Sequence, residues 1–129
     1  MPYIKRVKQI TPQMRKIESQ MCSAVQNSQD WQSANTSVHF DPESNVSIIR
    51  LHGNKIAEVG DDSLTLFDGG WQSNTTKSRL NALLSTFGYT SGQVREYIFQ
   101  KNYEWFVSTF DDKFQQVVTV PFESGMVIA

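Results

Sequence analysis

The chain has few residues of the kinds that perform nucleophilic, acid–base or metal chemistry, and they are widely separated. It contains two histidines, His39 and His52, and one cysteine, Cys22. Their positions do not match the ligand spacing of a zinc site, and they form no pattern typical of a nucleophilic triad. His52 could form an acid–base pair with Glu58 in space, but a histidine beside Gly-Asn more often belongs to an exposed hairpin turn. We therefore expect a protein that is not an enzyme and that requires no metal or other cofactor.

Acidic residues at two turns are the remaining candidates for a metal site. Asp61 and Asp62 follow Gly60, and Asp68 precedes a Gly-Gly pair. These carboxylates lack the spacing of an EF-hand calcium loop. They are therefore interpreted as hydrated residues of two turns.

A candidate anion-binding segment follows the Gly-Gly pair, at the expected start of a helix. In Thr75-Thr76-Lys77-Ser78-Arg79, a cap at Thr76 would bring free backbone N–H groups, two hydroxyls and two basic side chains to the positive end of the helix dipole. Such a cluster could hold an anion. The alternative interpretation is an ordinary helix cap with hydrated basic side chains.

Charge is distributed unevenly along the chain, although the net charge is only −1. Residues 1–27 contain five basic residues and one acidic residue, whereas residues 28–70 contain two basic and seven acidic residues. A basic arm on an acidic body can bind an external anion such as nucleic acid, or it can fold back on the acidic face. The candidate nucleic-acid-binding residues are Lys5, Arg6, Lys8, Arg15, Lys16, Thr75, Thr76, Lys77 and Arg79.

Length and composition predict a single domain over residues 1–129. A chain of 129 residues with 39% hydrophobic residues is close in size to an average domain and can bury an ordinary core. We expect a basic helical arm and linker over residues 1–35 and an α+β core over residues 36–129. No apolar run approaches the roughly 18 residues that span a bilayer, so we expect a soluble protein without membrane association.

The first expected element is an amphipathic helix over residues 12–26, with Thr11 as its N-cap and Pro12 in its first position. Its apolar stripe is rich in methionine, which is typical either of core packing or of an adaptable groove for a partner. The stripe contains Met14, Ile17, Met21 and Val25. Residues 27–37 are polar apart from Trp31 and are expected to form a loop.

The rest of the chain predicts a small antiparallel sheet, made of a meander and an aromatic hairpin, packed on one helix. Short apolar-rich segments separated by turn residues indicate antiparallel strands. The expected strands cover residues 36–40, 46–51, 55–59, 63–67, 95–100, 103–110 and 114–122. The first of them is expected at a sheet edge, because Pro42 follows it. A helix over residues 76–87, ended by Gly88, would place its Leu/Phe stripe on this sheet.

Aromatic residues are dense in the predicted hairpin, with six between positions 97 and 110. Both faces of the 103–110 strand carry large apolar side chains. Such a strand is either covered on both sides, here by the two helices, or it presents an apolar surface to a partner. The candidate partner-binding residues are Met14, Ile17, Met21, Tyr103 and Trp105.

Four segments in the central and C-terminal parts of the chain form a distinctive pattern. They are Leu51-His52-Gly53-Asn54-Lys55-Ile56-Ala57, Asp68-Gly69-Gly70-Trp71, Thr75-Thr76-Lys77-Ser78-Arg79-Leu80-Asn81-Ala82-Leu83-Leu84 and Val120-Pro121-Phe122-Glu123-Ser124-Gly125-Met126. The pattern resembles small accessory proteins of tailed bacteriophages, in particular those that infect cyanobacteria. The resemblance covers roughly residues 46–128, leaves out residues 1–45, and implies no catalytic residues.

The resemblance and the residue patterns together favour a binding role. We expect a non-enzymatic, phage-encoded accessory protein that binds a host or phage protein in the host cytoplasm. One alternative is a nucleic-acid-binding protein that uses the basic N-terminal arm. A further alternative is a small virion or assembly component, which would form a discrete oligomer.

Overall fold

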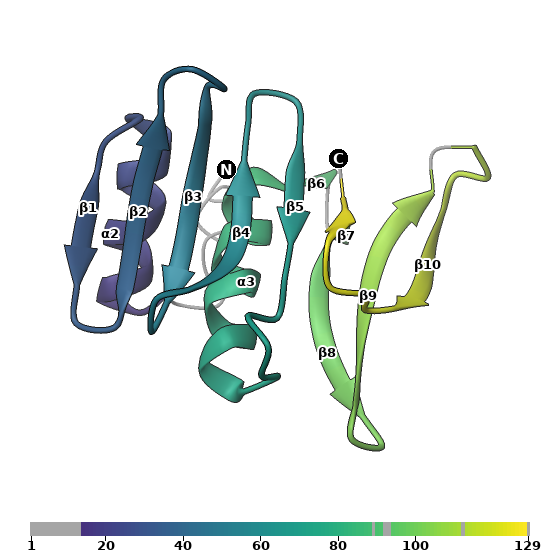
Figure 1. Ribbon diagram of the computed structural model, residues 1–129. Coiled ribbons are helices and arrows are strands. Elements are labelled where there is room, and N and C mark those ends of the chain that lie inside the picture. Colours follow the sequence, from purple (N-terminus) through teal and green to yellow (C-terminus); the bar gives the residue numbers. More distant parts are fainter. Residues whose placement is uncertain (1–13, 89, 92–93, 112, 129) are drawn as a thin grey trace, which may run out of the picture.

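The protein has a mixed α+β fold, as the sequence predicts. The computed structural model describes residues 14–88, 90–91, 94–111 and 113–128. Helices α2 (Lys16–Gln26) and α3 (Asn74–Phe87) pack on one face of a six-stranded sheet, and a three-stranded sheet stands beside it (Figure 1). The core therefore lies between one layer of helices and one layer of strands.

The larger sheet is a meander with one additional strand from the C-terminus. Its order is β1-β2-β3-β4-β5-β11, and all its neighbouring strands are antiparallel. The strands are β1 (Trp31–Ser33), β2 (Thr36–Asp41), β3 (Val46–Leu51), β4 (Asn54–Val59), β5 (Leu64–Leu66) and β11 (Met126–Val127). The predicted meander is confirmed, and the C-terminal tail docks by pairing β11 with β5.

The remaining strands follow α3 in the sequence. Strands β6 (Thr90–Ser91) and β7 (Val94–Arg95) form a two-stranded ribbon. The three-stranded sheet has the order β10-β9-β8 and contains β8 (Tyr97–Lys101), β9 (Glu104–Asp111) and β10 (Gln116–Pro121). The β8–β9 hairpin is the predicted aromatic hairpin.

The expected loop over residues 27–37 is wrong in part, because this stretch contains β1. Trp31 pairs with Val38, and the carboxylate of Asp30 accepts a hydrogen bond from the backbone N–H of Phe40 at 2.8 Å. Strand β2 is consequently an internal strand and not the predicted edge. A three-residue strand with one large apolar side chain is too short to show the alternation that identifies strands in a sequence.

Helix α2 begins later than expected. Arg15 has extended backbone angles (φ −63°, ψ 152°), so the helix starts at Lys16, and the predicted cap at Thr11 and Pro12 lies outside the described residues. The methionine-rich stripe faces inward, with Met21 fully buried in the core. Of the two interpretations of the stripe, core packing and a groove for a partner, core packing is therefore correct at Met21.

Helix α3 begins two residues before the predicted start. Its N-cap is Ser73, whose side-chain oxygen accepts a hydrogen bond from the N–H of Thr76 at 3.1 Å. The leucine stripe is fully buried, as expected. The helix ends at Gly88, where a Cβ atom would lie only 2.6 Å from the carbonyl oxygen of Leu84. Glycine is required there by this close approach.

A buried ion pair joins the two helices to the sheet. Glu18 on α2 accepts a hydrogen bond from the Arg79 guanidinium on α3 at 2.8 Å, and both side chains are at most 5% exposed. The Ser78 hydroxyl donates to the same carboxylate oxygen at 2.6 Å. Arg79 Nε also donates to the hydroxyl of Thr36 on β2 at 3.0 Å. Each charged group is thus paired and hydrogen-bonded, as burial requires.

The single cysteine is also buried between the helices. The Thr86 hydroxyl donates to Cys22 Sγ at 3.4 Å, and the thiol reaches the carbonyl oxygen of Ala82 at 3.7 Å. Burial is the largest influence on the pKa of the Cys22 thiol, and it raises that pKa. The hydrogen bond from Thr86 lowers the pKa, and the nearby Glu18 carboxylate raises it further, so the net shift is upward. The thiol is therefore kept protonated and unreactive in the folded protein.

We expect Arg79→Ala to lower the free energy of unfolding by about 3–5 kcal/mol, because it leaves the Glu18 carboxylate buried without its counter-ion. Lys77→Ala, on the same helix, should change it by less than about 0.5 kcal/mol. Urea denaturation of the two variants makes the comparison. A double variant, Glu18→Leu with Arg79→Leu, should be more stable than Arg79→Ala, because it leaves no unpaired buried charge. If Arg79→Ala lowered the free energy of unfolding by less than about 1 kcal/mol, this account would be contradicted.

We also expect stability to fall as pH rises above 9.0, the ordinary thiol value, because the unfolded thiol loses its proton there while the folded one keeps it. Denaturation of wild type and Cys22→Ala across this range isolates the effect, since the other titrating groups are common to both. Identical pH dependence in the two proteins would refute it. A thiol reagent should label Cys22 slowly until the protein unfolds.

Candidate functional site

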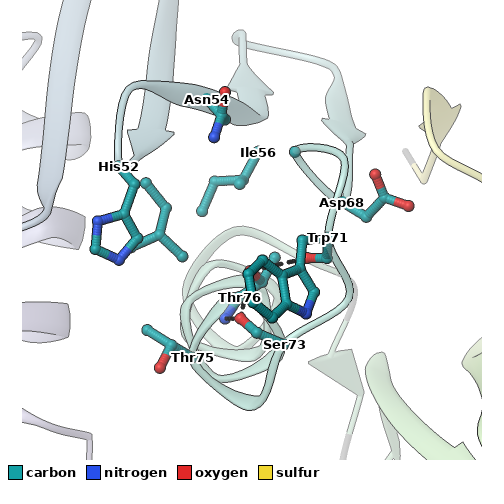
Figure 2. A pocket seen from close by; sticks show the side chains of 10 residues that line it. His52, Asn54, Ile56, Asp68, Trp71, Ser73, Thr75 and Thr76 are labelled. Atoms are coloured by element: carbon teal, nitrogen blue, oxygen red, sulfur yellow. Dashed lines mark hydrogen bonds between the residues drawn. The ribbon is translucent and has the colours of Figure 1, made fainter.

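A pocket of about 420 Å³ lies at one end of the larger sheet. Three segments form it: the β3–β4 turn, the turn over residues 68–70, and the first turn of α3 (Figure 2). Its volume is within the usual range for ligand pockets, roughly 300–1,000 Å³. The pocket is thus the point where the segment between β5 and α3 crosses the end of the β3–β4 hairpin.

The floor of the pocket is apolar and buried. It includes Leu51 and Ile56, which are 5% and 1% exposed and belong to the core of the sheet. Gly69 lies against this floor with a φ of +70°, and a Cβ atom there would lie 3.2 Å from a methyl carbon of Ile56. Only glycine combines this backbone conformation with so close an approach.

Trp71 stands at the wall of the pocket with its indole 78% exposed. Its backbone is held in place, because its N–H donates to the Asp68 carbonyl at 3.3 Å and its carbonyl accepts from the Ser73 N–H at 3.1 Å. The Asp68 side chain in turn accepts from the N–H of Gly70 at 2.8 Å. A fixed backbone therefore presents a large aromatic side chain to solvent.

The rim of the pocket carries hydrogen-bonding groups and one acidic residue, Asp68. His52, Asn54 and Thr75 line it, and His52 and Trp71 lie on opposite sides of Ile56 in Figure 2. None of the described residues that line the pocket is lysine or arginine. The apolar floor, the exposed indole and the Asp68 carboxylate, with no lysine or arginine among these lining residues, suit an apolar side chain better than an anion.

The predicted anion-binding segment is divided among different environments. Thr76 is buried, and its hydroxyl interacts with Ser73 and the Trp71 carbonyl, while Arg79 is paired with Glu18 in the interior. Thr75 lines the pocket, and Lys77 lines a separate, open depression of about 600 Å³ between α2, α3 and β8. The five residues therefore do not converge at the start of α3.

The basic residues of the N-terminal arm are only partly within the described chain. Arg15 and Lys16 are exposed at the start of α2, and Lys5, Arg6 and Lys8 lie outside the described residues. Arg79, by contrast, is 4% exposed. Its burial removes it from the predicted nucleic-acid-binding set.

Of the five candidate partner-binding residues, Tyr103 alone is well exposed. Met21 and Trp105 are core residues, 0% and 4% exposed, whereas Met14 and Ile17 are partly buried. Tyr103 is 93% exposed and occupies the hairpin turn with a φ of +67°, so β9 starts one residue later than expected. Trp105 packs edge-on against Phe122, with the ring centroids 5.3 Å apart.

The two faces of the aromatic hairpin differ in what covers them. Trp105 and Val107 are buried on the inner face, and α3 packs against β8 on that side. The outer face carries an aromatic row, Tyr97, Phe99 and Phe106, whose successive ring centroids are 5.7 Å apart. Helix α2 packs instead on β2, β1 and α3. The expectation that both helices cover the hairpin is therefore wrong.

Trp71 lines the pocket but is absent from the candidate site residues that the sequence predicts. The available signal was a large aromatic side chain directly after Gly69-Gly70 and just before a helix cap. That position places an aromatic residue in a turn and outside the apolar stripe of α3. A turn of this kind can hold a side chain outside the core.

The described part of the chain shows neither a metal-binding cluster nor a membrane-spanning helix. No group of three or more His, Cys, Asp or Glu side chains is arranged there to hold a metal ion. Neither α2 nor α3 is long and apolar enough to cross a membrane.

Comparison with known proteins gives one family match. The model of the family described as "Kyanoviridae Gp96 protein" matches residues 14–129. The match extends further toward the N-terminus than the expected 46–128 and includes α2 as well as β1 and β2. Curated proteins and solved structures give no match.

Proposed function

Since the chain belongs to the Kyanoviridae Gp96 family of cyanophage-type tailed-phage proteins, we propose that it is a non-enzymatic accessory protein that binds a host or phage protein through the pocket beside Trp71. The proposed place of action is the host cytoplasm. The observation that carries the proposal is the exposed indole at the wall of a pocket with an apolar floor.

Protein interfaces support this assignment of the pocket. A few residues carry most of the binding energy in such interfaces, and tryptophan is enriched among them. Burying an exposed aromatic side chain removes a large apolar surface from water. Because the backbone of Trp71 is already fixed by hydrogen bonds to Asp68 and Ser73, little backbone entropy is lost when a partner covers the ring.

The chemistry of the pocket favours an apolar anchor side chain from the partner. Leu51 and Ile56 would contact that side chain at the floor, and Trp71 would cover it from the side. His52, Asn54 and Thr75 lie at the rim, where they can hydrogen-bond to the backbone around the anchor. This arrangement of an apolar centre with a polar rim is typical of protein interfaces.

The nucleic-acid alternative has weaker support. Arg79 forms an ion pair with Glu18, and the N–H of Thr76 donates to the capping residue Ser73. The alternative then rests on the N-terminal arm together with Lys77, and it predicts binding that weakens steeply with salt. The capture experiment described next distinguishes this nucleic-acid alternative from protein binding.

The test is capture of partners by the tagged protein from a lysate of infected host cells, with and without nuclease. We expect one protein to be retained after nuclease treatment and to be lost with Trp71→Ala. Tyr103→Ala is the matched control, since Tyr103 is also an exposed aromatic residue but lies at the β8–β9 turn. With the purified partner, Trp71→Ala should raise the Kd about 30-fold, corresponding to about 2 kcal/mol.

Other outcomes of this experiment are equally informative. Retention that disappears with nuclease, and affinity that falls steeply with salt, would favour the nucleic-acid alternative. Loss of the partner with Tyr103→Ala and its retention with Trp71→Ala would move the contact to the hairpin turn. Denaturation of Trp71→Ala should give wild-type stability within about 0.5 kcal/mol, because the side chain is exposed.

A further inference from the structure

Strand β10 is the outer strand of the three-stranded sheet, and β9 is its one strand neighbour in the described part of the chain. Six consecutive residues, Gln116–Pro121, pair with β9. The opposite side of β10 therefore forms a free strand edge (Figure 1). The long edge of a strand offers backbone groups that another strand can bind.

The register identifies the backbone groups on this free edge. The N–H of Phe122 donates to the carbonyl of Trp105 at 3.0 Å, and residues 116–121 continue the same pairing register. Because hydrogen-bonded pairs alternate along an antiparallel ladder, the backbone groups of residues 116, 118 and 120 point to β9. Those of Val117, Thr119 and Pro121 point outward, and proline has no N–H to leave unpaired.

The other edge of the same sheet is closed. The edge of β8 that faces away from β9 lies against α3, where the Asn81 side chain accepts from the N–H of Ile98 at 2.7 Å and donates to the Ile98 carbonyl at 3.0 Å. This side chain occupies the position that a further strand would take. In the larger sheet, the outer strands β1 and β11 have only three and two residues. Among the described strands, β10 thus has the longest edge without such a cover.

Side chains do not protect the free edge of β10 in the usual way. Natural edge strands often carry lysine or another charge that prevents pairing. Residues 114–122 contain no charged residue, and Val117 is 51% exposed. Pro121 protects only the end of the strand. The centre remains available for pairing.

We propose that β10 pairs antiparallel with β10 of a second copy of this chain, which joins two three-stranded sheets into one six-stranded sheet. An antiparallel pair around a two-fold axis is self-complementary. With the axis at Val118, Val117 of each copy lies opposite Thr119 of the other. Each such pair exchanges two N–H···O=C bonds, so the two pairs use the free donors of both residues.

The composition of β10 favours a second copy as the occupant. Self-pairing brings no like charges together, because the strand is uncharged. Valine and threonine are favourable cross-strand neighbours. Val117 also lies beside Phe110 on the outer face, so pairing would cover the exposed valine and extend that face across both copies. The dimer does not depend on the Trp71 pocket, and Trp71→Ala should leave it intact.

Sedimentation equilibrium of the full chain over a range of concentrations tests the proposal. We expect a monomer–dimer equilibrium in which Thr119→Pro raises the dimer dissociation constant at least tenfold. This substitution removes an outward N–H and leaves the hydrogen bonds to β9 in place. Thr119→Val is the matched control, because it keeps the N–H and should still form dimers. Val117→Lys is a second disrupting variant in case the proline variant does not fold.

Hydrogen exchange supplies a readout at single residues. In the wild type, the amides of Val117 and Thr119 should exchange more slowly as protein concentration rises. The amides of Val118 and Val120 should be protected at every concentration, since they bond to β9. A wild type that remains monomeric at high concentration, or a dimer that persists unchanged in folded Thr119→Pro and Val117→Lys, would overturn the proposal.

Discussion

The buried ion pair between Glu18 and Arg79 is the constraint on which the arrangement of the elements depends. Removing two charges from water is costly, and the cost is offset only if each charge keeps its partner and its hydrogen bonds. Arg79 meets this condition by contacting α2 through Glu18 and β2 through Thr36. The pair therefore permits few relative positions of the two helices and the sheet. Uniform apolar packing would restrict them much less.

Once α3 is held in this way, its first turn and its middle organise the surface around it. Its first turn, capped by Ser73, closes one side of the Trp71 pocket. Further along the helix, Asn81 binds the backbone of Ile98 and closes the outer edge of β8. The same helix thus shapes the Trp71 pocket and leaves β10 as the open edge of the smaller sheet.

The predicted anion-binding segment included Arg79, which the structure places in the interior beside Glu18. Part of the reason can be read in the sequence. Arg79 lies three residues after Thr76 and four before Leu83, so it belongs to the buried face of α3. Glu18 occupies the equivalent position on α2, three residues before Met21. A single charge of opposite sign within each apolar stripe suggests a buried pair. Which two charges meet depends on how the helices pack, and sequence spacing does not give that.

The sequence by itself determined the local elements: the meander, the leucine-rich helix and the aromatic hairpin. Their signals are periodicity and turn residues, which act over a few neighbours along the chain. Tertiary structure alone decided that Trp105 is buried and Trp71 exposed, and it alone paired β1 with β2 and β11 with β5. The physical reason is that burial and strand pairing depend on groups far apart in the sequence, which only the folded chain brings together.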